Sequence, residues 1–326
     1  MGKKLGKILS LFGPFLGLLF VYLVFVLVAP QSFHTLYNTK TILQQAVIIG
    51  IAALGMTLVI ISAGIDLSVG SLVALGTVVT GLVLKAWGAA GMGFWLPLAA
   101  AFAGILACAF CGFINGLIIT RLRIVPFIVT LGMMQIARGL ALGFSGQRTV
   151  NAPRSWLTNM MMVEPRMGVW HSVAPGVWLM LALFALMFVV LRYTVFGRHV
   201  YAVGSNEATA RLCGIRVGLN RVCVYTICGI MAGIASVMAF SVLNVGDPTG
   251  AIGFELDVIA AVVIGGGSFS GGEGSVVGSI VGALIIAVLR NGCQQVGVEN
   301  YVQNIVIGSI IIIAVGLDQL KRARQT

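Results

Sequence analysis

The side chains that could carry chemistry in this chain are few, because it holds only 9 acidic residues and 3 histidines among 326 residues. Asp66 stands out, since it lies in the stretch Gly64–Ser71 between two apolar runs. A carboxylate there can cap the following helix by accepting hydrogen bonds from the amides of its first turn. A carboxylate in apolar surroundings is also costly and often marks the path of a substrate or ion. The two roles are compatible, and the residue pattern favours the cap.

Other polar side chains suit the binding of hydroxyl groups or of a partner protein. Asp247, Glu255 and Asp257 lie just before a short apolar segment, where they could receive a substrate, dock a protein or simply be solvated. Asn115 and Asn244 could exchange hydrogen bonds with hydroxyl groups. The alternative for each asparagine is a hydrogen bond between helices, worth about 0.6–2 kcal/mol. The sequence leaves these alternatives open.

Motifs for several catalytic chemistries are absent from the sequence. There is no G-x-x-x-x-G-K-[ST] phosphate loop and no H-E-x-x-H zinc motif, and the histidines are isolated. Cys108 and Cys111 form a C-x-x-C inside an apolar run, where packing is a better interpretation than redox or metal chemistry. The near absence of acids within the apolar runs argues against a proton-relay carrier. We therefore expect no catalytic residue, no metal and no cofactor.

The composition indicates which elements must hold these residues. The chain is 59% hydrophobic and 9% charged, whereas a soluble domain carries about 25% charged residues. This excludes an ordinary soluble enzyme and a disordered protein, and it indicates an all-α, polytopic integral membrane protein. The apolar runs predict ten membrane segments in one domain over residues 1–326, near Leu9–Ala29, Ile42–Ala63, Leu67–Leu84, Phe94–Thr120, Ile124–Phe144, Pro175–Leu191, Val222–Leu243, Val258–Gly267, Ser275–Leu289 and Tyr301–Leu317. The segment Val258–Gly267 is too short to cross as a regular helix, so we expect it to be broken or re-entrant.

The net charge of +11 is informative through its position along the chain. With ten crossings and a cytoplasmic N-terminus, 13 Lys and Arg residues lie on the inner side and 7 on the outer side. Inner loops are usually the richer in positive charge, so we expect both termini in the cytoplasm and no nucleic-acid partner. A long outer loop covers about residues 145–174, and a long basic inner loop covers about residues 192–221.

Small residues recur at four-residue spacing in three of the predicted segments. They are Ala100, Gly104, Cys108, Gly112 and Gly116, then Gly229 and Gly233, then Gly274, Gly278 and Gly282. Helices in lipid associate through close backbone approach rather than through hydrophobic burial. We therefore interpret most of the 43 glycines as packing surface.

The basic inner loop contains the signals of a short helix over Asn206–Cys213. Ser205 is a suitable N-cap, Glu207 lies in the first turn and Gly214 is a suitable residue just after the C-terminus. On these signals alone, a lever for a partner protein and a simple connector are equally good interpretations.

Four stretches of sequence occur in an order shared with a known family. They are Gly55–Ile60 with Gly64–Ser71, then Gly197–Ile215, then Phe254–Gly266, and then Gly271-Gly272 leading into Gly278. Through them the chain resembles, from its second segment to its C-terminus, the membrane-spanning permeases of bacterial ABC sugar importers, in particular the ribose-type branch. The four stretches together make the resemblance specific, whereas none of them alone would.

The resemblance implies a permease that catalyses no reaction and forms the translocation path for a monosaccharide such as ribose or another pentose or hexose. It also implies that the permease lies in the lipid of the bacterial inner membrane and has three protein partners. These are a cytoplasmic ABC ATPase subunit, a periplasmic sugar-binding protein and a second permease copy. The alternatives are a permease of the same family for a non-sugar polar solute, such as a signalling furanone, and a secondary transporter.

Residue types and resemblance together give the expected sites. The coupling segment for the ATPase would comprise Gly204, Ser205, Asn206, Glu207, Ala208, Arg211 and Gly214. Candidates for the translocation path are Asp66, Ser68, Asn115, Asn244 and Asp257. Candidates for docking of the binding protein are Asp247 and Glu255.

Overall fold

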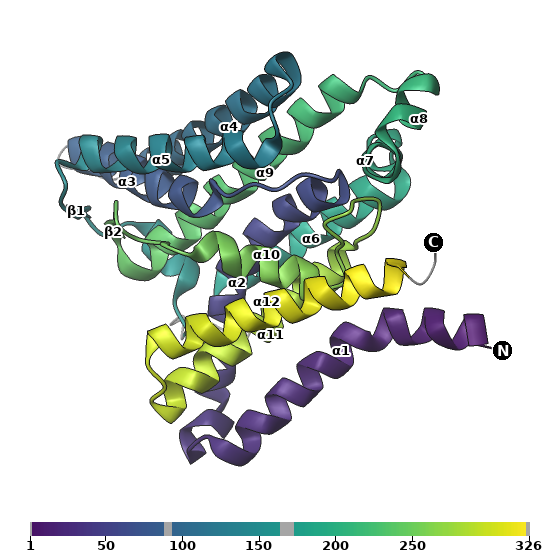
Figure 1. The fold of residues 1–326 in the computed structure, drawn as a ribbon. Coiled ribbons are helices and arrows are strands. Elements are labelled where there is room, and N and C mark those ends of the chain that lie inside the picture. The colour runs from purple at the N-terminus through teal and green to yellow at the C-terminus, as the bar shows by residue number, and fades with distance from the viewer. Residues whose placement is uncertain (1, 88–92, 164–172, 324–326) are drawn as a thin grey trace.

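The computed structural model describes residues 2–87, 93–163 and 173–323 and is almost entirely helical (Figure 1). Part of the predicted outer loop therefore lies outside the described residues. The elements in chain order are α1 (Gly2–Val28), η1 (Gln31–His34), α2 (Leu36–Ile61), α3 (Val69–Trp87), α4 (Trp95–Leu122), α5 (Pro126–Ser145), β1 (Val150–Asn151), η3 (Trp156–Met161), α6 (Pro175–Tyr193), α7 (Val195–Ser205), α8 (Glu207–Leu212), α9 (Val217–Leu243), β2 (Val245–Gly246), α10 (Phe254–Ile264), α11 (Val276–Val296) and α12 (Asn300–Ala323).

Seven helices in the described ranges are long and apolar enough to cross a membrane, namely α2, α3, α4, α5, α6, α9 and α11. The prediction of ten crossings is therefore not confirmed. The apolar stretches Gly13–Val28 of α1 and Asn300–Ile313 of α12 are shorter. As expected, the eighth segment is short, since α10 has 11 residues and a regular crossing needs about 20.

Small residues let the central helices pack backbone to backbone, as the sequence predicts. A Cβ atom placed on Gly112 of α4 would lie 3.0 Å from the Cα of Gly229 in α9. A Cβ on Gly233 would lie 2.7 Å from the Cα of Ile105. Gly282 of α11 is likewise pressed against the backbone of Ala261 in α10. At these positions the helices approach too closely for any side chain larger than that of glycine.

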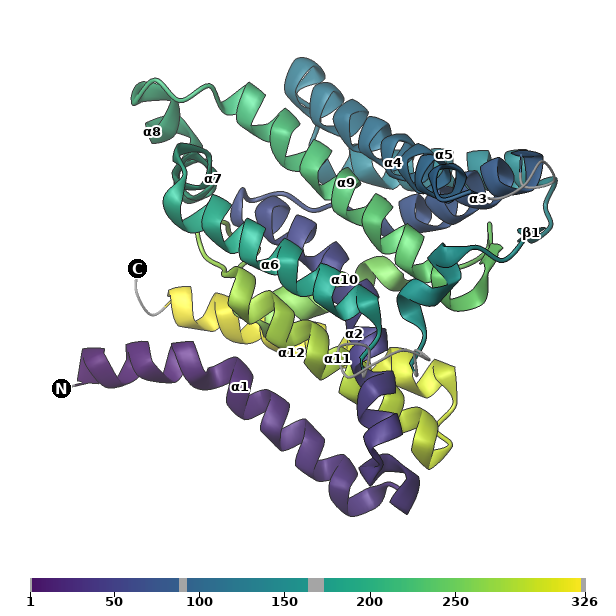
Figure 2. The same ribbon diagram turned by 180° about the vertical axis from the view of Figure 1, so that it is seen from behind.

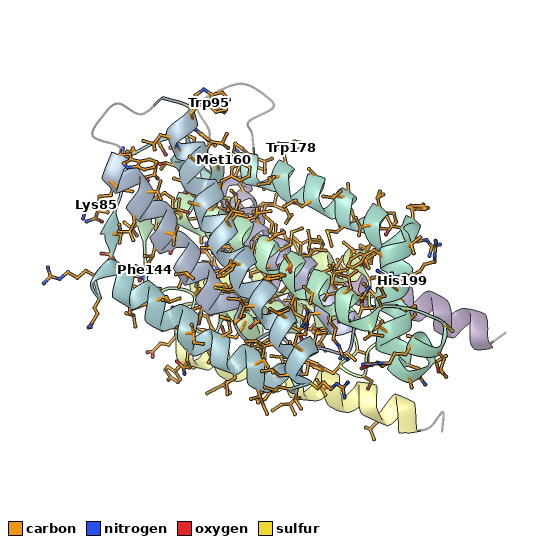
Figure 3. The ribbon with its side chains drawn as sticks, turned by 90° about the horizontal axis from the view of Figure 1, so that it is seen from above. Lys85, Trp95, Phe144, Met160, Trp178 and His199 are labelled. Carbon is orange, nitrogen blue, oxygen red and sulfur yellow. The ribbon has the colours of Figure 1, made fainter. Side chains whose placement is uncertain are left out.

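The two sides of the molecule differ in character. The beginning of α1, the end of α12 and the α7–α8 arm lie on one side, and the β1–β2 pair lies on the other (Figures 1 and 2). Seen from above, Lys85 and Trp95 lie on the left, which is the side of β1 and β2 in Figure 1, whereas His199 of α7 lies on the right (Figure 3). We call these the β side and the α7–α8 side.

Candidate functional site

Asp66, Ser68 and Asn115 form one buried cluster, although they come from different parts of the chain. The Asp66 Oδ1 atom accepts hydrogen bonds from the Ser68 backbone N–H at 2.9 Å and from the Ser68 hydroxyl at 2.5 Å. The Asn115 side-chain amide donates to the Ser68 hydroxyl oxygen at 3.1 Å. All three residues are 0% exposed. The structure therefore brings together three of the five residues predicted for the path.

This cluster has unused hydrogen-bonding capacity. Asp66 Oδ2 and Asn115 Oδ1 are buried and receive no hydrogen bond from a nitrogen or oxygen donor in the described part of the chain. The thiol of Cys228 in α9 lies beside the Asp66 carboxylate. Buried acceptors without donors are costly, so they mark a place that favours a hydroxyl or amide donor.

The cluster lies within the bundle rather than at its surface. Asn115 precedes the end of α4 at Leu122 by seven residues, which is about 10 Å at 1.5 Å per residue. The Tyr225 hydroxyl, from two turns inside α9, donates to the Ile65 carbonyl at 3.3 Å. The connection from α2 to α3 is therefore irregular backbone that is buried inside the bundle. Such backbone is tolerated at membrane depth only where protein or a cavity surrounds it.

The expected cap of the next helix is present in modified form. The Asp66 carboxylate bonds the amide of Ser68, which is the residue just before α3 begins. The Ser68 carbonyl then accepts the first bond of the helix, from Leu72 N–H at 2.8 Å. Asp66 thus orders the start of α3 through its Oδ1 atom.

A second irregular segment runs from β2 to α10 along the side of α3. Near its beginning, the Asp247 backbone N–H donates to the Thr77 hydroxyl at 3.2 Å. Near its end, the Glu255 carboxylate lies against Gly70, in the first turn of α3. Gly246 packs beside Val78, eight residues further along α3 than Gly70, a separation of about 12 Å by helix rise. Glu255 is therefore half-buried against the first turn of α3, about two turns of that helix from Gly246, and its role in docking stays a prediction.

Arg138 is the functional candidate that the sequence analysis missed. It projects from the middle of α5, and its Nη1 atom donates to the carbonyls of Pro248 at 2.9 Å and Gly250 at 2.7 Å. Its charge also acts on the carboxylates of Glu255 and Asp247. An arginine in the middle of an apolar run is itself a signal of function in membrane proteins, and it could have been recognised.

Three further predicted site residues form structural hydrogen bonds in separate places, namely Asn244, Asp257 and Asp247. Asn244 joins β2 to the preceding loop, donating to the Ala152 carbonyl at 3.1 Å. Asp257 of α10 is bonded by the guanidinium of Arg290 in α11 through both oxygens, at 2.7 and 2.9 Å. The Asp247 Oδ1 atom accepts from the backbone N–H and hydroxyl of Thr249. None of these contacts adjoins the Asp66 cluster.

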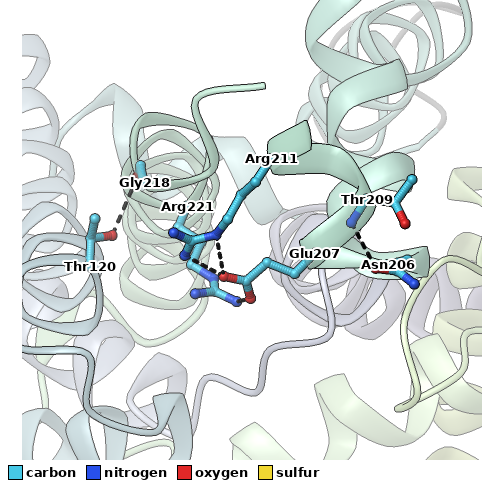
Figure 4. Close-up of polar contacts among 7 residues, drawn as sticks. All are labelled: Thr120, Asn206, Glu207, Thr209, Arg211, Gly218 and Arg221. Atoms are coloured by element: carbon cyan, nitrogen blue, oxygen red, sulfur yellow. Dashed lines mark hydrogen bonds and ion pairs between the residues drawn. The ribbon is translucent and has the colours of Figure 1, made fainter. Parts of the chain in front are cut away.

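The predicted coupling segment is a pair of short helices on the α7–α8 side. The helix predicted over Asn206–Cys213 is confirmed as α8, within one residue at each end. Its N-cap is Asn206 and not Ser205, because α7 continues through Ser205 and leaves only Asn206 with extended backbone. The Asn206 side chain accepts from the Thr209 N–H at 2.9 Å (Figure 4). Gly214 follows the helix with φ of +79°, as its predicted position requires.

Glu207 links α8 to the long helix α9. Its carboxylate receives the guanidinium of Arg211 at 2.6 Å and that of Arg221 at 2.5 Å (Figure 4). Partial burial raises the pKa of Glu207, but the hydrogen bonds and charges of the two arginines outweigh it, so its pKa is lowered. The carboxylate is therefore ionised at neutral pH and ties the two helices together, whereas Ala208 beside it is exposed.

The α7 helix is fastened to the interior at Gly204. The backbone of Ile61, at the end of α2, lies directly against this glycine, leaving no space for a Cβ atom. The Gly272 N–H donates to the same Ile61 carbonyl at 2.8 Å, and the Tyr201 hydroxyl donates to the Gly274 carbonyl at 2.8 Å. A displacement of α7 must therefore act on α2 and on the loop between α10 and α11.

The geometry defines a class of protein, a polytopic helical membrane protein with a helical arm, α7–α8, attached on one side. Two irregular segments lie inside its bundle, the connection from α2 to α3 and the stretch from β2 to α10, and we call these the broken segments. Within the described residues, no group of three or more His, Cys, Asp or Glu side chains is arranged to hold a metal ion. A polar interior reached by broken segments is a frequent feature of transporters.

Comparison with known proteins identifies the family. Residues 38–315 match the family described as branched-chain amino acid transport system / permease component. The ribose import permease protein RbsC of Escherichia coli strain K12 is 39% identical over 307 residues, covering 93% of this chain and 92% of that protein. The galactose/methyl galactoside import permease protein MglC of the same strain is 35% identical, covering 94% of each. The fructose import permease protein FrcC of Rhizobium meliloti is 34% identical, covering 94% and 84%.

The chain belongs to this family of membrane permeases. The family resemblance stated from the sequence is confirmed, and the chain is a transport subunit rather than an enzyme. The relatives do not favour the furanone permease or the secondary transporter that were kept as alternatives.

Proposed function

We propose that this chain is the permease of an ATP-driven importer for a monosaccharide, such as ribose or another pentose or hexose. The observation that carries the proposal is the joint match to import permeases for ribose, fructose and galactose over more than nine tenths of the chain. The absence of a phosphate loop from the sequence places ATP hydrolysis on a separate ABC ATPase subunit. The whole chain, residues 1–326, acts as one transmembrane domain in the bacterial inner membrane.

The translocation path passes the place where the two broken segments meet. Asp66, Ser68 and Asn115 lie on one side of α3, and Glu255 and Arg138 approach its first turns and the neighbouring loop from α10 and α5. Alternating carboxylate, hydroxyl, amide and guanidinium groups suit a neutral, hydroxyl-rich substrate. Because the Asp66 cluster is buried, the path is closed at that level in this conformation. We assign Glu255 to the path and keep Asn244 and Asp257 as supports of its frame.

The α7–α8 arm is the contact for the ATPase. Its support is the fastening described above: Glu207 joins α8 to α9, and Gly204 joins α7 to α2. Both of these long helices continue into the polar interior, where Tyr225 of α9 contacts Ile65 just after α2. Closure of the ATPase subunits would push the arm and shift both helices together, which favours one access state of the path over the other.

The remaining partners follow from the two sides of the molecule. With the α7–α8 side in the cytoplasm, both chain ends lie in the cytoplasm and a periplasmic binding protein docks on the β side, near residues 145–174 and Asp247. A second permease copy packs on α5, where Gly132, Gly139 and Gly143 have no neighbouring atom within 4 Å of a Cβ position. Membrane lipid surrounds the rest.

The test is co-purification and transport. The tagged chain should bring down an ABC ATPase subunit, and vanadate should stop uptake of labelled ribose into proteoliposomes that also hold the binding protein. Competition by unlabelled fructose and galactose then ranks the substrates. Failure to retain an ATPase subunit, together with vanadate-insensitive uptake, would exclude the importer.

A further inference from the structure

A large crevice lies between α1 and α6 on the α7–α8 side, away from the broken segments. Its volume is about 930 Å³, within the range of small-molecule sites, about 300–1,000 Å³. One wall carries Phe15 of α1, the other carries Phe188 and Leu191 of α6, and α11 forms the floor with Val277. Figure 2 shows α1 and α6 as separate ribbons with the α11 region between them.

One end of this crevice is positively charged. Arg192, at the last turn of α6, and Arg198, on α7, both line it. Both side chains are exposed, and within the described part of the chain neither forms an ion pair. Tyr201 of α7 also lines the crevice, and its hydroxyl is close enough to Arg192 to interact with the charge of that arginine. Among the described residues that line the crevice, none is acidic.

The apolar and charged parts are arranged in the order of a phospholipid. The aromatic and aliphatic walls follow the membrane-crossing part of α6, and the arginines lie where α6 ends and α7 begins. The N-terminus of α11 adds its partial positive charge at the same level, with Ser275 as its N-cap. Basic pockets between transmembrane helices on the cytoplasmic side suit anionic headgroups. A free anion would use the charged end but would leave the apolar walls unfilled.

We propose that this crevice is a binding site for an anionic phospholipid, with its phosphate between Arg192 and Arg198 and an acyl chain between Phe15 and Phe188. The site joins α6 and α7 to the first turn of α11 and to Gly274, the loop residue that Tyr201 binds. A lipid held there would stabilise the attachment of the α7–α8 arm to the interior. The proposal needs a membrane-embedded chain but no particular transported substrate.

The test measures lipid binding to the purified full-length chain. Detergent-solubilised protein is titrated with phosphatidylglycerol or with phosphatidylcholine of the same acyl chains, and bound lipid is counted by native mass spectrometry. Phosphatidylglycerol should bind at least tenfold more tightly, and Arg192→Gln/Arg198→Gln should remove most of this preference. Val277→Trp, which narrows the apolar part and keeps both arginines, should weaken binding as well. Thermal unfolding of each variant checks that it is folded.

The matched control is Arg121→Gln/Arg123→Gln, which removes two exposed arginines from the same side at the end of α4. It should change phosphatidylglycerol binding less than twofold. Equal losses in both double variants would show a general effect of surface charge and overturn the site. Displacement of the lipid by millimolar inorganic phosphate would show a free-anion site and overturn the lipid assignment. Because neither sugar nor ATPase is present, these outcomes leave the importer proposal untouched.

Discussion

The helices α4 and α5 are neighbours in the chain, yet they use glycine in opposite ways. On α4, a Cβ at Gly112 or Gly116 would press into the backbone of α9. On α5, a Cβ at Gly132, Gly139 or Gly143 would meet no atom within 4 Å. The same sequence signal therefore describes a filled contact in one helix and an empty surface in the next. Only the three-dimensional arrangement distinguishes packing within the chain from a surface left for something else.

The strongest test of this comparison is Gly112→Leu. The added side chain would separate α4 from α9, and overpacking of this kind costs typically 1–3 kcal/mol and occasionally more. We expect about 3 kcal/mol here, because the atoms in contact are backbone atoms that cannot turn away. The measurement is the midpoint of thermal unfolding in detergent.

The matched variant is Gly139→Leu on α5. It should leave the unfolding midpoint of the isolated chain unchanged, because the position is open. If a second copy covers α5, the same variant should lower the dimer fraction measured by light scattering. Equal loss of stability in the two variants would remove the distinction between the two helices.

The next largest effect is expected at the buried ion pair between α10 and α11. Asp257→Asn leaves the Arg290 guanidinium without its bidentate partner. Removing one member of a buried pair costs about 3–5 kcal/mol, and we expect about 2 kcal/mol because the Arg290 side chain is 25% exposed. Chemical denaturation should show this loss, and Asp257→Asn/Arg290→Gln should recover part of it. If the double variant were no more stable than Asp257→Asn, the unpaired Arg290 charge would not be the cause of the lost stability.

Local signals made the arm predictable, whereas the polar interior depends on distant contacts. The limits of α8 and the role of Gly214 follow from capping residues within a few positions. The shortness of α10 likewise follows from the length of one apolar run. The contact of Ser68 with Asn115 joins residues 47 positions apart, and no periodicity encodes it. Hydropathy also cannot show that residues 62–68 are buried inside the bundle, because it measures how polar a stretch is and not where that stretch lies in the folded molecule.

A smaller effect is expected at the cap of α8. Asn206→Ala removes the acceptor for the Thr209 N–H, and loss of such a cap costs about 1 kcal/mol. The cost falls on the short arm rather than on the bundle, so sugar-stimulated ATPase activity should fall several-fold while the unfolding midpoint hardly changes. Ser205→Ala is the control, because Ser205 is not the cap. A larger effect of Ser205→Ala would return the cap to the position that the sequence suggested.

The smallest stability effect is expected for Glu207→Gln. The ion pair between Glu207 and Arg221 is more exposed than the pair between Asp257 and Arg290. Exposed ion pairs contribute about 0–1 kcal/mol, and the Glu207 side chain is 35% exposed. Because folding lowers the pKa of Glu207, its contribution is complete above the ordinary pKa of 4.5 and is lost as the pH falls through the lowered value. The difference in unfolding midpoint between wild type and variant should therefore stay constant at neutral pH and vanish in acid.

The functional readout separates a mechanical role of Glu207 from a structural one. If Glu207 transmits motion from α8 to α9, the variant should uncouple ATP hydrolysis from sugar at any pH where the wild-type carboxylate is ionised. Arg211→Gln should have the milder effect, because Arg211 joins Glu207 within α8, whereas Arg221 joins it to α9. Equal uncoupling by Arg211→Gln and Arg221→Gln would mean that the carboxylate only stabilises α8. A difference between them would place the transmission at the contact with α9.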